Sequence, residues 1–190
     1  MSSRDAIFAA LDSCSLPDAP MPTITVEPNN TDLIGQYEAN LAKVGGTLVQ
    51  VSSLEEVQAQ LNAAMADNQQ VISRVEGLTG NRELDAKPHD LHNVDLAILD
   101  AELAVAENGA VFVRETASGH RVLPYITENL AVVVKRDTTV ANMHEAVKVV
   151  KLESGQHGAF IAGPSKTADI EQALVIGAHG ACSMTVYMIG

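Results

Sequence analysis

The turn Gly163–Thr167, with the sequence GPSKT, carries residue types from which proteins build anion sites. The apolar stretch Ala159–Ala162 is typical of a strand and leads directly into this turn. Residues 168–174 have a helix-forming composition, so we expect Ser165 or Thr167 to cap the start of a helix. A helix start carries a partial positive charge and free N–H groups, which favour phosphate or carboxylate. The turn therefore predicts a site for a small anion.

Further side chains extend this expectation. Lys166 adds a positive charge to the turn, and the planar guanidinium of Arg121 suits a bidentate pair with a carboxylate or phosphate. Asp169 either belongs to the site or only favours the helix start electrostatically. His179 is a general base, a ligand contact, or a histidine that stabilises a helix C-terminus. The candidate anion-binding residues are Gly163, Ser165, Lys166, Thr167, Asp169, Arg121 and His179.

The order GPSKTADIE followed by IGAHG closely resembles the C-terminal signature of the LUD-domain family, the lactate utilisation protein C group formerly classed as a domain of unknown function. The resemblance extends more weakly through Val94 to Lys135. It implies a fold similar to the NagB/RpiA/CoA-transferase superfamily. It also implies a role in oxidising L-lactate to pyruvate beside iron–sulfur proteins. In that superfamily, CoA transferases use a glutamate before a glycine-containing turn as a nucleophile, and Glu107 is similar to it.

Two positions depart from the family pattern. The family typically shows alanine-glutamate-threonine-glycine where this chain has Asn108 in the third place, so an amide replaces a hydroxyl. A family histidine usually follows the arginine-leucine-proline segment, whereas Glu128 or Asn129 stands near that place here. If the family histidine acts as an acid or a base, this chain does not use it in the same way.

Composition limits the classes of function. Twelve Lys and Arg against 24 Asp and Glu give a net charge of −12, which repels nucleic acid and is compatible with docking to a basic partner. Cys14 and Cys182 lie far apart without metal-ligand spacing, so we expect no metal site and no iron–sulfur cluster in this chain. No apolar run approaches the length of a membrane span, and we expect a cytoplasmic protein.

The first half of the chain predicts a short appendage and the start of an α/β domain. Residues 1–30 form an expected N-terminal helix, Met1–Leu11, and a proline-rich arm, and residues 31–190 form the domain. Apolar spacing predicts a helix that starts at Thr31 and ends at Gly45-Gly46. The expected elements that follow are a strand at Thr47–Val51, a helix capped by Ser52 or Ser53, and a strand at Gln70–Val75. Strand, helix and strand of these lengths indicate a parallel sheet.

The second half predicts further strands and one long helix. Asn108-Gly109 indicates a hairpin of Leu103–Ala106 with Ala110–Val113. The other expected elements are strands at Asn129–Lys135 and Met184–Ile189 and a helix at Thr139–Glu153 with Val140, Met143, Val147 and Val150 facing inward. The fold class is α/β, with three layers around a modified, open, mostly parallel sheet. Ligands of such sheets bind beyond the carboxyl ends of the strands, where we expect the turn at Gly163, the Glu107 turn and Arg114–Pro124 to converge.

Three functions are consistent with these features. The resemblance implies a subunit of a lactate-oxidising system, in which iron–sulfur partner proteins carry the redox centres and this chain supplies an anion site or a docking surface. Alternatively, the chain is a stand-alone enzyme of the CoA-transferase type, using Glu107 on a CoA thioester, a phosphorylated sugar or a folate. A third possibility is a non-catalytic scaffold.

Overall fold

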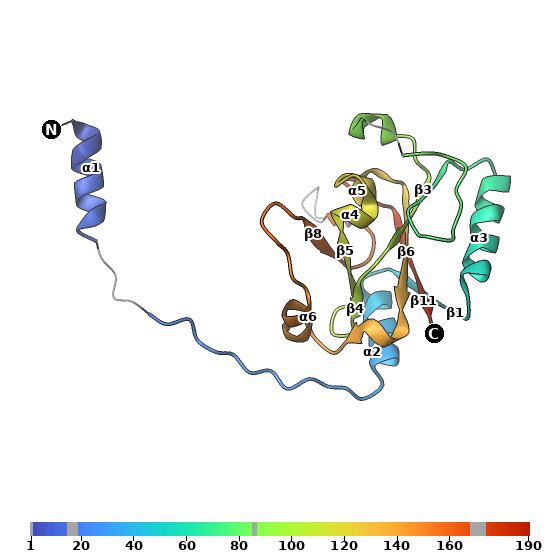
Figure 1. Ribbon diagram of the computed structural model, residues 1–190, viewed down its shortest axis with the longest axis horizontal. Coiled ribbons are helices and arrows are strands. Elements are labelled where there is room, and N and C mark those ends of the chain that lie inside the picture. The colour runs from blue at the N-terminus through green and yellow to red at the C-terminus, as the bar shows by residue number, and fades with distance from the viewer. Residues whose placement is uncertain (1, 15–18, 85–86, 168–173) are drawn as a thin grey trace.

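The computed structural model describes residues 2–14, 19–84, 87–167 and 174–190 (Figure 1). These residues form a five-stranded sheet, a four-stranded sheet and flanking helices. All strand pairs of the five-stranded sheet are parallel. The expected α/β fold with a mostly parallel central sheet is confirmed.

The central sheet contains apolar strands that are buried on both faces. In spatial order it contains β1 (Thr47–Val51), β11 (Ser183–Ile189), β6 (Asn129–Lys135), β3 (Leu96–Asp100) and β2 (Val71–Ser73). Near-continuous apolar runs such as Leu130–Val134 are typical of parallel strands covered on both sides. The expected strand–helix–strand unit is parallel, but β1 and β2 lie at opposite edges of the sheet because β11, β6 and β3 pair between them.

The second sheet contains the predicted hairpin. In spatial order its strands are β7 (Thr139–Val140), β4 (Leu103–Val105), β5 (Ala110–Arg114) and β8 (Gly158–Ile161). Strands β4 and β5 pair antiparallel around Gly109, whose φ of 71° suits the tight turn. Strand β8, which leads into GPSKT, pairs antiparallel with β5 and not with the central sheet. A separate two-stranded ladder joins β9 (Lys166–Thr167) to β10 (Val175–Ile176).

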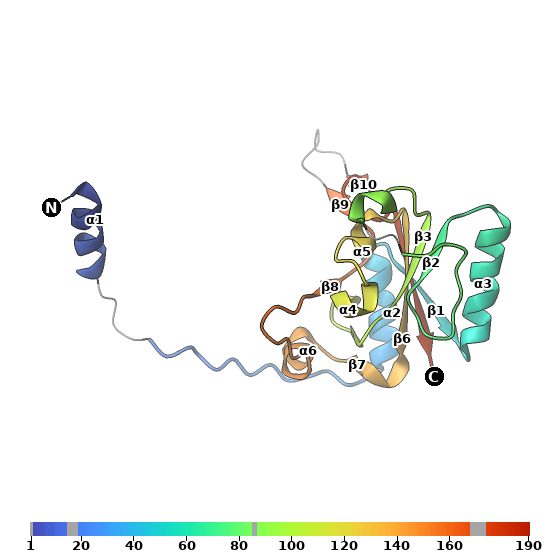
Figure 2. The same cartoon turned by 45° about the horizontal axis from the view of Figure 1, so that its top comes forward.

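Helices and sheets are stacked in layers around three apolar clusters (Figures 1 and 2). Helix α3 (Leu54–Ala66) covers one face of the central sheet, where Val57 and Leu61 are fully buried. Helix α2 (Leu33–Lys43) and the second sheet pack on the opposite face. Helix α6 (Met143–Val149) contacts the outer face of the second sheet through Ala146. The short helices are α4 (Glu115–Ser118), α5 (Leu123–Ile126), η1 (Pro88–Leu91) and η2 (Arg136–Thr138).

The predicted helix Thr139–Glu153 is wrong at both ends. Thr139 and Val140 belong to strand β7, which pairs with β4, and the Asn142 side chain accepts the N–H of Glu145 and so starts α6 after it. The helix ends at Val149, because Val150 adopts an extended conformation. Val147, expected inside, is 57% exposed. Strand pairing at β7 therefore overrides the helical apolar spacing of this segment.

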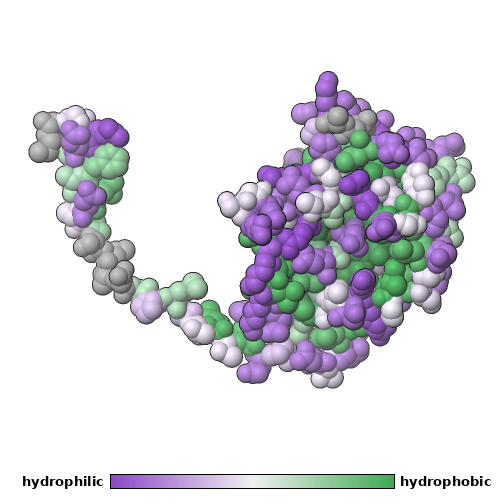
Figure 3. Space-filling model, in the orientation of Figure 1, coloured by the Kyte–Doolittle hydropathy of each residue, from purple (hydrophilic) through white to green (hydrophobic). Residues whose placement is uncertain are grey.

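The expected N-terminal helix is present as α1 (Ser3–Asp12). Ser2 and Asp5 form a reciprocal capping box at its start. None of its residues is buried, and Ile7 and Phe8 are 61% and 52% exposed. The helix lies apart from the α/β domain, and Figure 3 shows its apolar residues open to solvent. Within the described ranges, every helix is too short or too polar to cross a bilayer.

Candidate functional site

The GPSKT turn packs against the end of helix α2. Gly163 is buried with a φ of 72°, and a Cβ atom there would collide with the carbonyl oxygen of Val44. The Nζ atom of Lys166 lies 3.1 Å from the position that a Cβ atom would take at Gly45, directly after α2. The ammonium of Lys166 therefore sits beside the partly negative carboxyl end of α2, which it stabilises.

Main-chain bonds hold the two halves of the sequence motif together. The N–H of Ser165 donates to Ala181 over 2.8 Å, and the Ser165 carbonyl accepts the N–H of Gly177 over 2.9 Å. The main-chain N–H of Ser165 is consequently engaged, whereas its hydroxyl and the Lys166 ammonium make no hydrogen bond with the residues the structure describes. Thr167 lies in strand β9, and the helix that Ser165 or Thr167 was expected to cap falls outside the described residues.

The remaining part of that prediction falls outside the described residues. The structure does not describe residues 168–173. The expected helix at 168–174 runs through this range, and the candidate Asp169 lies within it. The turn is therefore defined on one side by β8 and on the other by β9. Its role in anion binding stays a prediction.

A cavity of about 350 Å³ opens beside the motif and contains His179. Its walls are the segments 92–95, 125–128 and 177–180, which immediately precede or approach β3, β6 and β11. His92, Asp95, Tyr125 and Glu128 line it with His179, so imidazole and carboxylate groups suited to proton transfer share one space. Figure 2 shows β9 and β10 close to α5 at this end of the molecule. The cavity lies at the amino edge of the central sheet, opposite to the edge where sequence reasoning expected a ligand.

Arg121 is paired with a carboxylate of its own segment. Its Nη2 atom donates to Oε2 of Glu115 over 2.8 Å, and this hydrogen bond lowers the pKa of Glu115. The Arg121 side chain is 58% exposed, so part of its guanidinium still faces water. A ligand carboxylate at Arg121 would share the guanidinium with Glu115.

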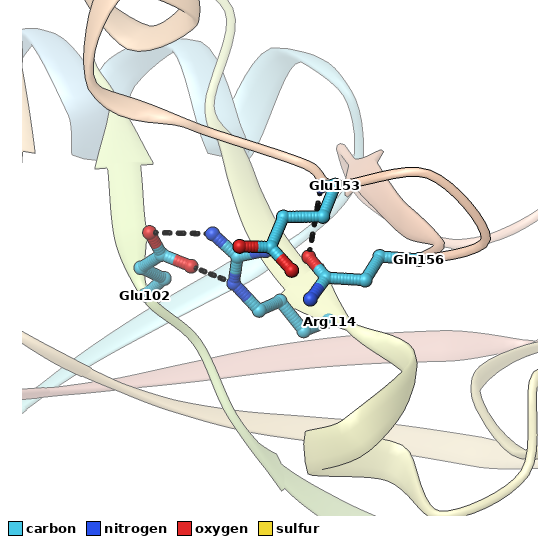
Figure 4. Close-up of polar contacts among 4 residues, drawn as sticks. All are labelled: Glu102, Arg114, Glu153 and Gln156. Atoms are coloured by element: carbon cyan, nitrogen blue, oxygen red, sulfur yellow. Dashed lines mark hydrogen bonds and ion pairs between the residues drawn. The ribbon is translucent and has the colours of Figure 1, made fainter.

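A larger cavity of about 700 Å³ lies at the carboxyl end of β5, next to Glu115. Arg114, Glu115 and Thr116 form one wall, and residues 151–157 form the other. The guanidinium of Arg114 makes two bonds to the carboxylate of Glu102, at 2.5 and 3.2 Å, and Figure 4 shows this pair beneath Glu153 and Gln156. Because Glu102 already occupies the fork of Arg114, Arg114 presents a neutralised pair to this cavity, whose other wall includes Lys151.

Glu107 contacts the start of a helix. Its Oε2 atom accepts the backbone N–H of Met143 over 2.9 Å, next to the Asn142 cap of α6. A carboxylate at a helix N-terminus is stabilising, so this contact gives Glu107 a structural role. Its side chain is exposed, and a nucleophilic role stays a prediction.

Of the three loops expected to converge, the Glu107 turn and the Gly163 turn lie at the start of β5, whereas the Arg114 loop begins at its other end. The Glu107 turn precedes β5 and Arg114 ends β5, so the length of that strand separates them. The Gly163 turn lies past the start of β5, because Ile161 of β8 pairs with Val111. The antiparallel pairing of β5 with β8, which strand propensity does not encode, determines where the Gly163 turn lies.

Sequence reasoning missed two charged residues at the carboxyl edge of the central sheet. Asp100 ends β3 and Lys135 ends β6, and these strands are neighbours. The available signal was a charged residue that directly closes an apolar strand, as in LAILD and LAVVVK. Within the described residues, no group of three or more His, Cys, Asp or Glu side chains is placed to hold a metal ion.

Comparison with known proteins places this architecture in a family. The sequence model of the LUD domain matches residues 39–189, which include both sheets and the GPSKT motif. The chain belongs to the LUD domain family. The expected family resemblance is thus confirmed over residues 39–189.

Individual relatives of this LUD domain chain are distant. It is 27% identical over 191 residues to a lactate utilization protein C of Geobacillus thermodenitrificans, covering 94% of this chain and 76% of that protein. It is 25% identical over 101 residues to a lactate utilization protein C of Oceanobacillus iheyensis, covering 50% of this chain but only 43% of that protein. The chain thus spans less than half of the length of the latter.

A solved structure shares the fold of this LUD domain. The crystal structure of a DUF162 family protein from Deinococcus radiodurans superposes with a TM-score of 0.58 and 19% sequence identity. The match covers 84% of this chain and 97% of that protein. At this identity the comparison shows the fold alone.

Proposed function

We propose that this LUD domain chain takes part in lactate utilisation. The observation that carries the proposal is the family match over residues 39–189, which includes the motif and both sheets. Relatives that align over most of this chain are named lactate utilization protein C. The GPSKTADIE and IGAHG segments, which resemble the signature of that group, support the same assignment.

The finer proposal is that the chain is a subunit of an assembly that oxidises L-lactate to pyruvate. The oxidation releases two electrons and two protons, and the electrons pass to iron–sulfur clusters held by partner proteins. This chain contributes a site for the organic anion or a docking surface. Its net charge of −12 favours docking to a basic partner surface and is compatible with a protein that acts in a complex.

Growth and capture experiments test this proposal. Deletion of the coding sequence is expected to abolish growth on L-lactate, to spare growth on glucose, and to be reversed by the intact chain. A tagged chain from lactate-grown cells is expected to recover iron–sulfur proteins together with lactate-dependent dye reduction. Normal growth of the deletion strain on L-lactate would contradict the proposal, and recovery of the chain alone would contradict the assembly.

The same strains separate the alternatives. If Glu107→Gln and Lys166→Ala chains both restore growth on L-lactate, a non-catalytic role gains support. Incubation of the purified chain with an acyl-CoA, followed by mass spectrometry of the peptide that contains Glu107, tests the transferase alternative. A covalent thioester on that glutamate would favour an independent enzyme. We expect an unmodified peptide, because the Glu107 carboxylate already accepts the N–H of Met143.

A further inference from the structure

A pair of opposite charges stands on one face of the central sheet at its carboxyl edge. Asp100 is the last residue of β3, and Lys135 is the last residue of the neighbouring β6. Ile98 and Val133, two residues earlier in each strand, pack in the apolar cluster under α3. Because side chains two residues apart in a strand share a face, Asp100 and Lys135 both extend the α3 side of the sheet.

Two adjoining cavities run along this edge. One of about 300 Å³ is lined by Leu54, Val75, Glu76, Asp100, Val133, Lys135 and Ile189. The other, of about 590 Å³, is lined by Lys135, Arg136, Asp137, Ile189 and Gly190. Lys135 and Ile189 line both, so we treat the two spaces as one groove, called the edge groove below. The edge groove lies beyond the carboxyl ends of parallel strands, where open α/β sheets bind their ligands.

Within the described residues, Asp100 and Lys135 are not paired with other protein groups. Neither the carboxylate of Asp100 nor the ammonium of Lys135 makes a hydrogen bond, or an ion pair within 4.0 Å, with the described residues. Both side chains are accessible to solvent. Lys135 nevertheless acts on Asp100 at longer range, since it opposes the stronger effect of burial, which raises the pKa of Asp100. A donor and an acceptor therefore face one groove with room between them.

The start of α3 adds to the potential at the same edge. Two residues separate the end of β1 from Leu54, the first residue of α3, so the partly positive N-terminus of α3 lies at the carboxyl edge of the sheet, together with Glu55 and Glu56 of its first turn. Glu76 and Asp137 line the outer parts of the edge groove on either side of Lys135. These carboxylates disfavour a phosphate ester, which carries close to two negative charges, although Arg136, whose guanidinium donates to Gln50, lines the same groove. A ligand with a single carboxylate meets less repulsion.

We propose that the edge groove binds a small 2-hydroxy carboxylic acid. The ligand carboxylate pairs with Lys135, the ligand hydroxyl donates to Asp100, and a small apolar substituent packs on Val75, Val133 and Ile189. The inference rests on the proposed function, since L-lactate has this chemistry. It goes beyond that function because it assigns two residues and an edge of the sheet that the sequence motif does not include.

Binding to the full chain, measured by isothermal titration calorimetry and by amide shifts in NMR, tests the site. We expect L-lactate to bind more tightly than propionate, which lacks the hydroxyl, and to shift amides at the ends of β3 and β6. Lys135→Gln is expected to weaken L-lactate about tenfold or more, the loss typical of a charge-assisted hydrogen bond. The matched control Lys43→Gln removes an exposed lysine of α2 and is expected to leave binding unchanged.

The aspartate has a sharper readout. Asp100→Asn, which keeps an acceptor oxygen but removes the charge, is expected to reduce the preference for L-lactate over propionate. The control Glu38→Gln, on an exposed face of α2, is expected to retain it. A reduced preference without change in thermal unfolding identifies a ligand contact and not a folding defect. An unchanged preference in Asp100→Asn would overturn the assignment. Tighter binding of L-alanine or of glycerol phosphate than of L-lactate would overturn the ligand class.

Failure of the site and failure of the proposed function give different results. If deletion of the chain abolishes growth on L-lactate but no L-lactate binds at the edge groove, the function stands and the site is wrong. If the deletion strain grows normally while L-lactate binds and depends on Lys135, the site stands and the function is wrong. If the deletion strain grows normally on L-lactate and no L-lactate binds at the edge groove, both the site and the function are wrong.

Discussion

The Oε2 atom of Glu107 accepts the backbone N–H of Met143 over 2.9 Å. The contact joins the β4–β5 turn to the first turn of α6, two segments separated by 36 positions in the sequence. It makes a residue of the turn part of the cap of a helix, together with Asn142. The position of α6 on the second sheet thus depends on a carboxylate that does not belong to it.

This contact predicts a stability effect. Glu107→Ala is expected to lower the free energy of unfolding by about 1 kcal/mol, because one N–H at the start of α6 loses its acceptor. Glu107→Gln keeps an acceptor oxygen and is expected to lose less. Urea unfolding followed by circular dichroism measures both. Equal stability of the alanine variant and the wild type would show that the contact contributes nothing in solution.

Gly109 and Gly155 form a matched pair for testing the hairpin. Both have a positive φ, of 71° and 87°, but a Cβ atom at Gly109 would lie 2.6 Å from backbone atoms of Leu41, whereas Gly155 has open space around it. Gly155→Ala is expected to cost about 1 kcal/mol of unfolding free energy from strain alone. Gly109→Ala is expected to cost about 2 to 4 kcal/mol, since the clash adds to the strain. Similar thermal shifts in both variants would refute the close approach of the hairpin to α2.

Tyr37 of helix α2 carries a buried hydroxyl without a hydrogen-bond partner among the described residues. Tyr37→Phe is expected to be neutral or to stabilise the fold by up to about 1 kcal/mol, because it removes an unsatisfied polar group and keeps the ring. Burial raises the pKa of Tyr37, so the folded state favours the neutral phenol. The wild type is expected to lose stability relative to Tyr37→Phe as the pH rises above about 10, where the unfolded tyrosine ionises. Parallel stability curves between pH 7 and pH 11 would count against this burial.

The pair Arg121–Glu115 predicts the opposite pH dependence. The hydrogen bond from Arg121 lowers the pKa of Glu115, so its contribution to stability is present above the pKa of the unfolded glutamate, about 4.3, and is lost as the pH falls through the folded value. Arg121→Gln is expected to raise the pKa of Glu115 and to remove that contribution. NMR titration of the Glu115 side chain measures the shift. An unchanged titration curve would show that the ion pair is not maintained in solution.

Local sequence determined most elements of this protein. Asn108-Gly109 favours a tight turn, and the hairpin forms there with Gly109 at a φ of 71°. The apolar run of β6 was predicted with the same bounds as the structure shows, because a strand buried on both faces needs no alternation. Helix α2 ends before Gly45-Gly46 as expected, since Gly45 adopts a φ of 84°.

Only the tertiary structure decided how these elements meet. Strand β8 pairs with β5, and the N–H of Ser165 donates to the carbonyl of Ala181. Local sequence does not specify which strand edge pairs with which, so the long-range hydrogen bonds of the folded state determine the pairing. The same holds for Asp100 and Lys135, which lie 35 positions apart and share an edge only because β3 pairs with β6. Residue types and spacing therefore predict groups that could bind an anion. Strand pairing determines which of them face one groove.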